Sequence, residues 1–461
     1  MLQLLCATIE VGLYLVLCAA CAHLVRLSLW ALRRGPLEAA PLVPPTSRSI
    51  TVQLPLRNEA QMAEALLRSS AKLEGSGLEV QALDDSDDET SAILDRVSAE
   101  LRVAGHSVTV LRRPDRRGYK AGNLAYGLAR SHAEYVLVLD ADFRPEPDLA
   151  SQLARSLDED PQLAFVQARW SFRNATTTLG RLQAAILDAL FCIEQAALSE
   201  ACAPVQFNGT GGMWRRSAID RAGGWDTSET SLTEDLDLSF RAHQAGLRGR
   251  TRPELVVSTE LPTSMHAFRA QQARWVRGAA LTVRTLGGRL VNNASLRAAL
   301  TIAGHLARHA RQPLFVAALV RLPLVAFGLA TPISPAWLGP VLVTGAIGSA
   351  TLYLGAGAMR AGQRARPLDG VRLALLSIGL APTLAVAFLG GLAGRRGRGF
   401  VRTVKGSNLD GAQPDVSRRE AFTAALCVVS CVALIGFART HDVPGVVAAL
   451  LCAVGTGWVA L

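Results

Sequence analysis

The sequence lacks the features by which nucleic-acid-binding proteins are usually recognised. It has no basic tail, no cysteine and histidine spacing typical of a zinc site, and no strand of interleaved aromatic and basic residues. We also find no internal repeat and no low-complexity tail. The formal net charge of +10 therefore does not indicate a nucleic-acid partner. It indicates arginines that face an inner leaflet and a domain that handles anionic ligands.

Cysteine is sparse, with eight in 461 residues, and most of these lie in apolar segments. Cys18 and Cys21 have the spacing of a redox motif, but they fall inside a hydrophobic helix without a βαβ context, so we interpret them as packing residues. Only Cys192 and Cys202 lie among the acidic motifs of the central region, which fits a reducing cytosol.

Positive charge is also missing ahead of the first apolar run, where a cleaved signal peptide would carry it. We therefore expect residues 1–34 to form an uncleaved transmembrane helix, with its N-terminus outside and the next domain inside. A Pro-rich linker at 35–47 follows this helix.

Apolar residues make up half of the chain, and the mean hydropathy of +0.24 is high for a soluble protein. We expect residues 286–461 to form interfacial and transmembrane helices. The run 296–311 predicts a helix in the membrane plane, and 312–331, 336–359, 420–438 and 443–460 predict spans. The run 371–394 stays open between a span and an interfacial or re-entrant helix, because arginines flank both of its ends.

Strand and helix patterns alternate in the more polar region at 48–285. Strands are expected at 50–56, 78–84, 107–113 and 135–142, with helices over about 59–72, 88–104 and 119–132 between them. This alternation predicts a Rossmann-like α/β domain with a mostly parallel sheet. Nucleotide chemistry is expected at the carboxyl ends of its strands.

The run VLVLDAD places Asp140 and Asp142 at the end of a buried strand, where alternation would point both carboxylates to one side. Two such carboxylates beside a diphosphate would bind a hard divalent cation such as Mg²⁺ or Mn²⁺. The alternative is a solvated loop that carries two acids, because D-x-D alone is a weak pattern.

Two further segments point to the same edge of the sheet. Asp84 and Asp85 end the second strand, and of the two we favour Asp85 as the residue near a nucleotide. Lys120 stands in the first turn of a helix beside Gly118, where free backbone amides make a phosphate site. A Gly-rich helix start with solvated basic residues explains the second segment equally well.

The segment TEDLDL begins with Thr233 as a good N-cap, followed by Glu234 and Asp235 in the first turn. These residues either cap the helix or make Asp235 a general base, which would have to reach the hydroxyl proton that it abstracts.

In QQARWVRG, at 271–278, helical spacing places Gln271, Arg274 and Trp275 on one face. Trp275 could stack on a sugar ring while Arg274 holds a diphosphate. The alternative is an ordinary interfacial cluster, since Trp and Arg both favour the headgroup level.

Taken in order, these segments resemble family 2 glycosyltransferases, and most closely the cellulose-synthase-like mannan and glucomannan synthases. The resemblance covers about half of the chain and implies a GT-A-type catalytic domain at 48–285 with transmembrane and interfacial helices around it. The motifs that carry it are QLPLRNE, LDDS, RRGYKAGNL, DADFRP, VQARWSF, FNGTGGMWR, AGGW, TEDLDL, ELP and QQARW.

The resemblance also implies the roles of individual residues. Asp140 and Asp142 would bind the metal and Asp235 would deprotonate the acceptor hydroxyl. The residues implied to bind the nucleotide sugar are Pro55, Glu59, Asp85, Lys120, Asp140, Gln271 and Arg274. The residues implied to bind the acceptor are Gly209, Thr210, Gly211, Glu234 and Trp275.

The implied activity is that of a membrane-bound inverting enzyme that moves a hexose from a donor of the UDP-glucose or GDP-mannose type onto a growing β-linked polysaccharide. Such an enzyme would be processive and coupled to export, in the plasma (inner) membrane, with its catalytic domain in the cytoplasm. The alternative is a non-processive enzyme that adds one sugar to a lipid acceptor. Leu56-Arg57 stands where the family usually has an aromatic residue, and Val276-Arg277-Gly278 departs from the mannan synthases, so the nucleotide and the sugar stay open.

Overall fold

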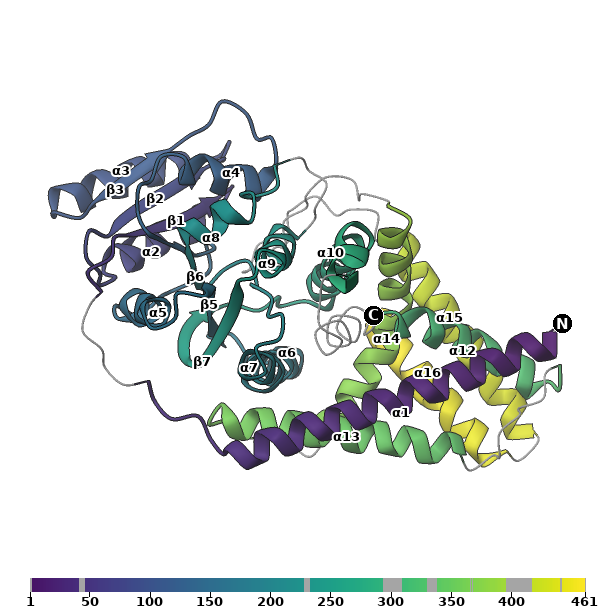
Figure 1. The fold of residues 1–461 in the computed structure, drawn as a ribbon. Helices are drawn as coiled ribbons and strands as arrows, with labels where there is room; N and C mark the ends of the chain where they lie inside the picture. The colour runs from purple at the N-terminus through teal and green to yellow at the C-terminus, as the bar shows by residue number, and fades with distance from the viewer. Residues whose placement is uncertain are drawn as a thin grey trace.

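A seven-stranded sheet forms the core of the catalytic region, with the strand order β3-β2-β1-β4-β6-β5-β7 (Figure 1). The computed structural model describes residues 2–40, 46–227, 233–292, 309–329, 338–364, 366, 368–394, 417–439 and 442–460. The strands are β1 Ile50–Leu56, β2 Glu79–Asp84, β3 Val108–Leu111, β4 Tyr135–Val138, β5 Leu163–Phe172, β6 Gly212–Arg215 and β7 Arg248–Thr259.

The first four strands run parallel, as the alternation of strands and helices predicts. They are linked by α2 Ala60–Ala71, α3 Thr90–Val103 and α4 Tyr119–Leu128. β1 and β4 are buried almost throughout, and β4 is an apolar run. β1 alternates instead, but its polar residues Thr51 and Gln53 are buried as well. Pro55 is tolerated in a central strand because β4 pairs with β1 only over Ile50–Gln53, so its missing N–H falls beyond that ladder.

The expected extent of the fourth strand is wrong at its end. β4 stops at Val138 and not at Asp142, because the chain turns where the Phe143 amide donates to the Asp140 carbonyl. Strand alternation therefore does not fix the directions of the Asp140 and Asp142 side chains.

The second half of the sheet contains antiparallel pairing. The short strand β6 lies between β4 and β5 and is antiparallel to both, while β5 and β7 are parallel. The helices of this half are α5 Leu149–Asp158, α6 Thr178–Ala189, the π-helix η1 Leu190–Gln195, α7 Ala196–Glu200, α8 Arg216–Arg221 and α9 Glu234–Gln244.

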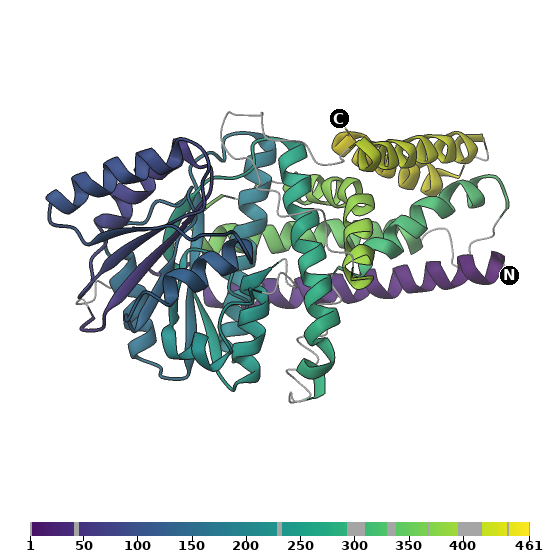
Figure 2. The ribbon, with the colours of Figure 1, turned by 90° about the horizontal axis from the view of Figure 1, so that it is seen from above.

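Apolar helices from both ends of the chain assemble beside the sheet, as Figures 1 and 2 show. The N-terminal helix α1 packs along α13, and α10 lies between the sheet domain and the remaining helices. These helices are α1 Leu2–Arg34, α10 Met265–Asn292, α12 Arg311–Ala326, α13 Leu338–Arg360, α14 Asp369–Leu392, α15 Ser417–Arg439 and α16 Val443–Ala460.

Three helices among the described residues are long and apolar enough to cross a membrane: Ala7–Arg34, Thr178–Glu200 and Asp369–Leu392. The third is the run that the sequence left open, and it forms one continuous helix, α14. The second connects two strands that pair in the same sheet, and along its length it contacts β5 and β7. It therefore lies on the catalytic domain. The in-plane helix expected at 296–311 falls largely outside the described residues.

One ion pair is buried among the apolar helices. Glu10 of α1 and Arg321 of α12 lie 2.5 Å apart, with their side chains 2% and 14% exposed. A charge inside an apolar bundle is costly, and pairing with an opposite charge offsets that cost. The pair links helices that are 311 residues apart in sequence.

Candidate active site

The carboxyl end of the sheet gathers charged side chains from three segments of the chain. Lys120, from the first turn of α4, lies with its Nζ atom 2.6 Å from Oδ1 of Asp140, which follows β4. The same ammonium donates to the carbonyl of Gly209 at 3.0 Å and lies 3.8 Å from Oε1 of Glu234. The Lys120 side chain is only 19% exposed, so the charges of these groups act on one another with little screening.

Burial lowers the pKa of the Lys120 ammonium, but the carboxylates of Asp140 and Glu234 outweigh it, so that the pKa is raised. Lys120 is therefore a fixed cation. Lys120 is thus not the solvated basic residue that the sequence also allows, and its role as a phosphate site stays a prediction.

The turn at 207–212 lies against this cluster. Thr210 holds Asp140, because its hydroxyl oxygen accepts a hydrogen bond of 2.8 Å from the Asp140 amide. Gly209 has a φ of +80°, and a Cβ atom there would lie 3.0 Å from Oδ2 of Asp235. The amide of Gly211 donates to the Val138 carbonyl at 2.8 Å. The turn thus presents backbone atoms to the site at the closest approach that glycine allows.

Asp235 lies in the first turn of α9, where its Oδ1 accepts from the Leu236 amide at 2.8 Å. Burial and the negative charge of Glu234 raise the pKa of Asp235 to about 7, against the opposing effects of the Leu236 amide and Lys120. A carboxylate with a pKa near neutrality suits a general base better than an ordinary helix cap.

The helix α10 carries a further set of predicted site residues. Gln271, Arg274 and Trp275 lie on it with helical spacing, and Gln271 is buried while the other two are half-buried. Burial lowers the pKa of Arg274, and the carboxylates of Glu234, Asp140 and Asp235 oppose that shift. Arg274 thus lies within the electrostatic influence of these three carboxylates, and its diphosphate role stays a prediction.

A close contact fixes α10 against the turn that carries Asp235. A Cβ atom on Gly278 would lie 2.3 Å from Cγ2 and 3.1 Å from Cβ of Thr233. Rotation of the Thr233 side chain changes the first distance but not the second, so any residue larger than glycine would have to displace Thr233 itself. Gly278 stands one helical turn after Arg274, a spacing from which its place on the same face could have been deduced.

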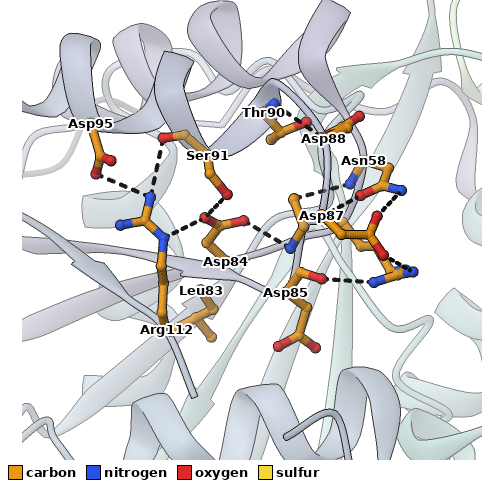
Figure 3. Close-up of polar contacts among 12 residues, drawn as sticks. Asn58, Leu83, Asp84, Asp85, Asp87, Asp88, Thr90, Ser91, Asp95 and Arg112 are labelled. Atoms are coloured by element: carbon orange, nitrogen blue, oxygen red, sulfur yellow. Dashed lines mark hydrogen bonds and ion pairs between the residues drawn. The ribbon is translucent and has the colours of Figure 1, made fainter. Parts of the chain in front are cut away.

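The residues that the sequence assigns to the nucleotide lie at the ends of β1 and β2, where Asp84 and Asp85 have different partners (Figure 3). Asp84 turns toward α3, where it accepts from Ser91 at 2.6 Å and from Arg112 at 2.8 Å. Asp85 lies away from these groups, and Arg113 binds its two oxygens at 2.8 and 2.6 Å. Both side chains of the Asp85–Arg113 pair are buried, at 7% and 5% exposure.

Residues of the first motif border Asp85. Arg57, which replaces the usual aromatic residue, donates to the Asp85 carbonyl at 2.8 Å and to Asp87 at 3.0 Å. Asn58 has a φ of +52° and exchanges hydrogen bonds with Asp87. Glu59 is half-buried and precedes α2. The guanidinium of Arg57 is thus held by two bonds.

Asp142 does not join Asp140 at Lys120. It is buried, and its Oδ2 accepts from the hydroxyl of Thr259 and from the Glu260 amide at the end of β7. Among the described residues, no group of three or more His, Cys, Asp or Glu side chains could hold a metal ion. The carboxylate of Asp140 is a hard, anionic donor and one-third exposed, so this residue fits a divalent cation whose other ligands come from a diphosphate and water. Asp142 has the same chemistry, but its Oδ2 is already bonded at the end of β7.

Two residues that the sequence did not single out hold the 207–212 turn. The buried Gln167 donates to the carbonyls of Thr210 and Gly211 at 3.0 Å and accepts from the Asn208 amide at 3.0 Å. Asn208 in turn exchanges hydrogen bonds with Gln195. A buried glutamine inside β5 was the available signal, because a buried amide needs several partners.

Comparison with known proteins agrees with this geometry. Residues 135–355, just under half of the chain, match the family described as glycosyl transferase family group 2. This match and the identity to glucomannan 4-beta-mannosyltransferases support the family 2, mannan-synthase-like protein that the ordered motifs predict. The chain is 38% identical over 255 residues to glucomannan 4-beta-mannosyltransferase 7 of Arabidopsis thaliana, a match that covers 53% of this chain and 45% of that relative.

Two further matches are similar in extent or in fold. Glucomannan 4-beta-mannosyltransferase 1 of Oryza sativa subsp. japonica is 38% identical over 251 residues, which cover 53% of this chain and 48% of that relative. The chain thus spans about half the length of the curated relatives it matches. The mannosyltransferase PcManGT of Pyrobaculum calidifontis, solved with GDP-Man and Mn²⁺, has a TM-score of 0.55 at 22% identity over 77% of this chain and 98% of its own. The predicted GT-A-type fold is therefore confirmed.

Replacing Gly278 by alanine should displace Thr233 and with it the first turn of α9. We expect the rate of sugar transfer to fall about tenfold or more, because displacements of about 1 Å in a catalytic group have effects of this order. The matched control is Gly345→Ala, since a Cβ on this α13 glycine meets nothing within 4 Å. Equal initial rates for the two purified variants would contradict the close contact.

Proposed function

We propose that this chain is a membrane-bound inverting glycosyltransferase that moves a hexose, of the mannosyl kind, from a nucleotide sugar onto a growing β-linked polysaccharide. The observation that carries the proposal is the placement of Asp235 beside the Lys120–Asp140 pair, with a pKa near neutrality. The names of the glucomannan 4-beta-mannosyltransferases favour mannose and a 4-linked β-glycan acceptor.

In the proposed reaction, Asp235 takes the proton from an acceptor hydroxyl. The oxygen of that hydroxyl forms a bond to the anomeric carbon of the donor as the bond from that carbon to the diphosphate oxygen breaks. The displacement is in line, so the configuration inverts in a single step, and a single base is sufficient. The opposed pair of carboxylates used by glycoside hydrolases is not required.

The leaving diphosphate gains negative charge, and cations of this chain are placed to stabilise it. Lys120 is held at Asp140, and Arg274 shares the field of the same carboxylates. Fixed cations in a site with little water are more effective than the same charges in bulk solvent. Trp275, one residue beyond Arg274 on α10, would stack on the acceptor sugar.

Asp140 and Asp142 would hold a divalent cation, Mg²⁺ or Mn²⁺, which would neutralise charge on the diphosphate when bound. At the other end of the donor, Pro55, Glu59 and Asp85 would line the nucleotide pocket. The Asp85–Arg113 pair and the fixed guanidinium of Arg57 give this pocket a rigid polar wall.

We propose a membrane location for the enzyme, supported by the candidate spans in α1 and α14. Residues 1–34 would be an N-terminal membrane helix, 35–47 a linker, 48–285 the catalytic domain and 286–461 interfacial and membrane helices. Arginines near the domain side of these helices support a catalytic domain in the cytoplasm. The polymer would be extended processively and would leave through the helices that pack against α10.

The donor and the product test this proposal directly. Membranes containing the protein should turn over GDP-mannose faster than UDP-glucose or UDP-N-acetylglucosamine, and the labelled product should be a long, mannosidase-sensitive glycan. If the only labelled products are short and partition into organic solvent, the acceptor is a lipid and not a growing polymer. If the protein turns over none of these three donors, the proposed function is refuted.

Asp235→Asn should abolish turnover, with a loss of about 1,000-fold or more, because the amide cannot accept the hydroxyl proton. Donor binding, measured by nucleotide titration, should stay within about twofold. Asp220→Asn is the matched control, since Asp220 is exposed on α8 outside the site. Activity of Asp235→Asn close to that of the control would refute the assigned base.

The pH dependence of kcat/KM should show an acid limb with a midpoint near 7, since Asp235 has its pKa raised to about 7 and must be deprotonated to act. Below this pH the rate should fall about tenfold per unit. Glu234→Gln removes a negative charge that raises the pKa of Asp235, so the midpoint should move to lower pH. A midpoint that stays fixed or rises in this variant would contradict the assignment of the limb to Asp235.

A further inference from the structure

The helical segment between β5 and β6 changes from α-helix to π-helix where it meets the apolar helices. The π-helix η1, Leu190–Gln195, packs against α13 and α1. In a π-turn the usual ladder of backbone hydrogen bonds is interrupted, so carbonyl oxygens become accessible to other donors. α13 supplies two such donors: the Tyr353 hydroxyl donates to the Ala189 carbonyl at 3.2 Å, and Nε of Arg360 donates to the Cys192 carbonyl at 2.8 Å.

Further contacts restrain Arg360 itself and the part of α13 near Tyr353. The Arg360 side chain also donates to the Gly35 carbonyl at 3.0 Å and lies over the Trp30 ring of α1, with 5.2 Å between its Cζ and the ring centroid. Near Tyr353, α13 approaches the segment at Gly357, where a Cβ atom would lie 2.8 Å from the Cα of Ala189. The segment and α13 are thus fixed to each other through backbone contacts.

The last residue of η1 reaches toward the catalytic site. The amide of Gln195 is buried and exchanges two hydrogen bonds with the Asn208 side chain, of 3.1 and 3.2 Å. The Thr251 hydroxyl donates to Oε1 of Gln195 at 3.1 Å. Asn208 is followed by Gly209, which accepts from Lys120, and by Thr210, which holds Asp140.

The π-turn determines where Gln195 points. It adds one residue to the helix, and one residue corresponds to a rotation of about 100° in an α-helix. Without the extra residue, Gln195 would be rotated by about this angle and would leave Asn208. The donors on α13 stabilise the carbonyl arrangement of the π-turn and so favour the rotation that is seen.

We propose that Tyr353 and Arg360 of α13 are positioning residues for sugar transfer. They hold the π-turn of η1, which holds Gln195 against Asn208, and the 207–211 turn then fixes Lys120 and Asp140 in the site. A membrane-associated helix thereby adjusts the catalytic machinery without touching a substrate. This inference rests on the proposed function for its kinetic readout.

A double-mutant cycle between Tyr353 and Gln195 tests the inference. Tyr353→Phe and Gln195→Ala should each lower kcat about fivefold to tenfold, the effect of losing hydrogen bonds that act on a site, with the donor KM within about twofold. If both residues act through one path, the double variant should be no slower than the slower single variant. Effects that multiply would overturn the proposal.

The matched control is Thr351→Val, which removes a hydroxyl of α13 that donates to the Ile347 carbonyl of the same helix and makes no hydrogen bond to the segment before β6 among the described residues. It should leave kcat within about twofold. Should Gln195→Ala fail to fold, Thr251→Val replaces it in the cycle, because it removes one hydrogen bond from the Gln195 amide. A loss in Tyr353→Phe that follows only the folded fraction of the purified enzyme would also overturn the proposal.

A second measurement does not depend on turnover. Amide hydrogen exchange in residues 207–211 should be faster in Tyr353→Phe than in the unmodified protein and in Thr351→Val. Unchanged exchange there would refute the coupling even if the enzyme makes the expected glycan. Faster exchange in a protein that turns over no nucleotide sugar would instead refute the proposed function and leave the coupling in place.

Discussion

The ammonium of Lys120 is largely buried and lies within hydrogen-bonding distance of Asp140. The other charged groups of the site lie around this pair. A buried cation is costly unless opposite charges surround it, and here the carboxylates of Asp140 and Glu234 lie within ion-pairing distance. Together with Asp235 these make three carboxylates, against the two cations Lys120 and Arg274. Burial and the negative charge of Glu234 raise the pKa of Asp235 to about 7, against the opposing charge of Lys120. The same small group of charges thus includes a fixed cation and a carboxylate that can take up a proton near neutral pH.

Much of the fold could be predicted from the sequence, because short segments rich in β-branched and other apolar residues alternate with helical patterns over its first four strands. β1 begins and ends where the run ITVQLPL does, and β2 differs by one residue. The end of β4 was missed because the chain turns after it, where the Phe143 amide donates to the Asp140 carbonyl. The Asp140 amide in turn donates to the hydroxyl of Thr210, which is 70 residues away. The place of β6 between β4 and β5, and the π-turn before it, depend on the same kind of distant contact. No local pattern encodes them.

The residues of the site could be predicted from the sequence better than the contacts between them. Asp235, Lys120 and Asp140 were expected from motif order and come together, but the sequence could not indicate that Asp142 turns to Thr259 or that Arg113 pairs with Asp85. Such pairings join residues whose separation in the chain carries no information about distance. Gly278 is an exception. Its spacing from Arg274 predicts that both residues lie on one face of α10. The reason for a glycine there becomes clear only once the Thr233 side chain is seen to pack against it.

The strand β6 has only four residues, yet among the strands of the described sheet it alone joins β3-β2-β1-β4 to β5 and β7. β5 and β7 pair extensively with each other, and this pairing does not involve the first four strands. Within the sheet the two groups of strands are therefore connected by β6 alone, whereas one hydrophobic core packs against strands of both groups. The 207–212 turn leads directly into β6, and it bonds to Lys120 and Asp140. The strand that closes the sheet is thus also the strand that brings this turn to the charged residues of the first group.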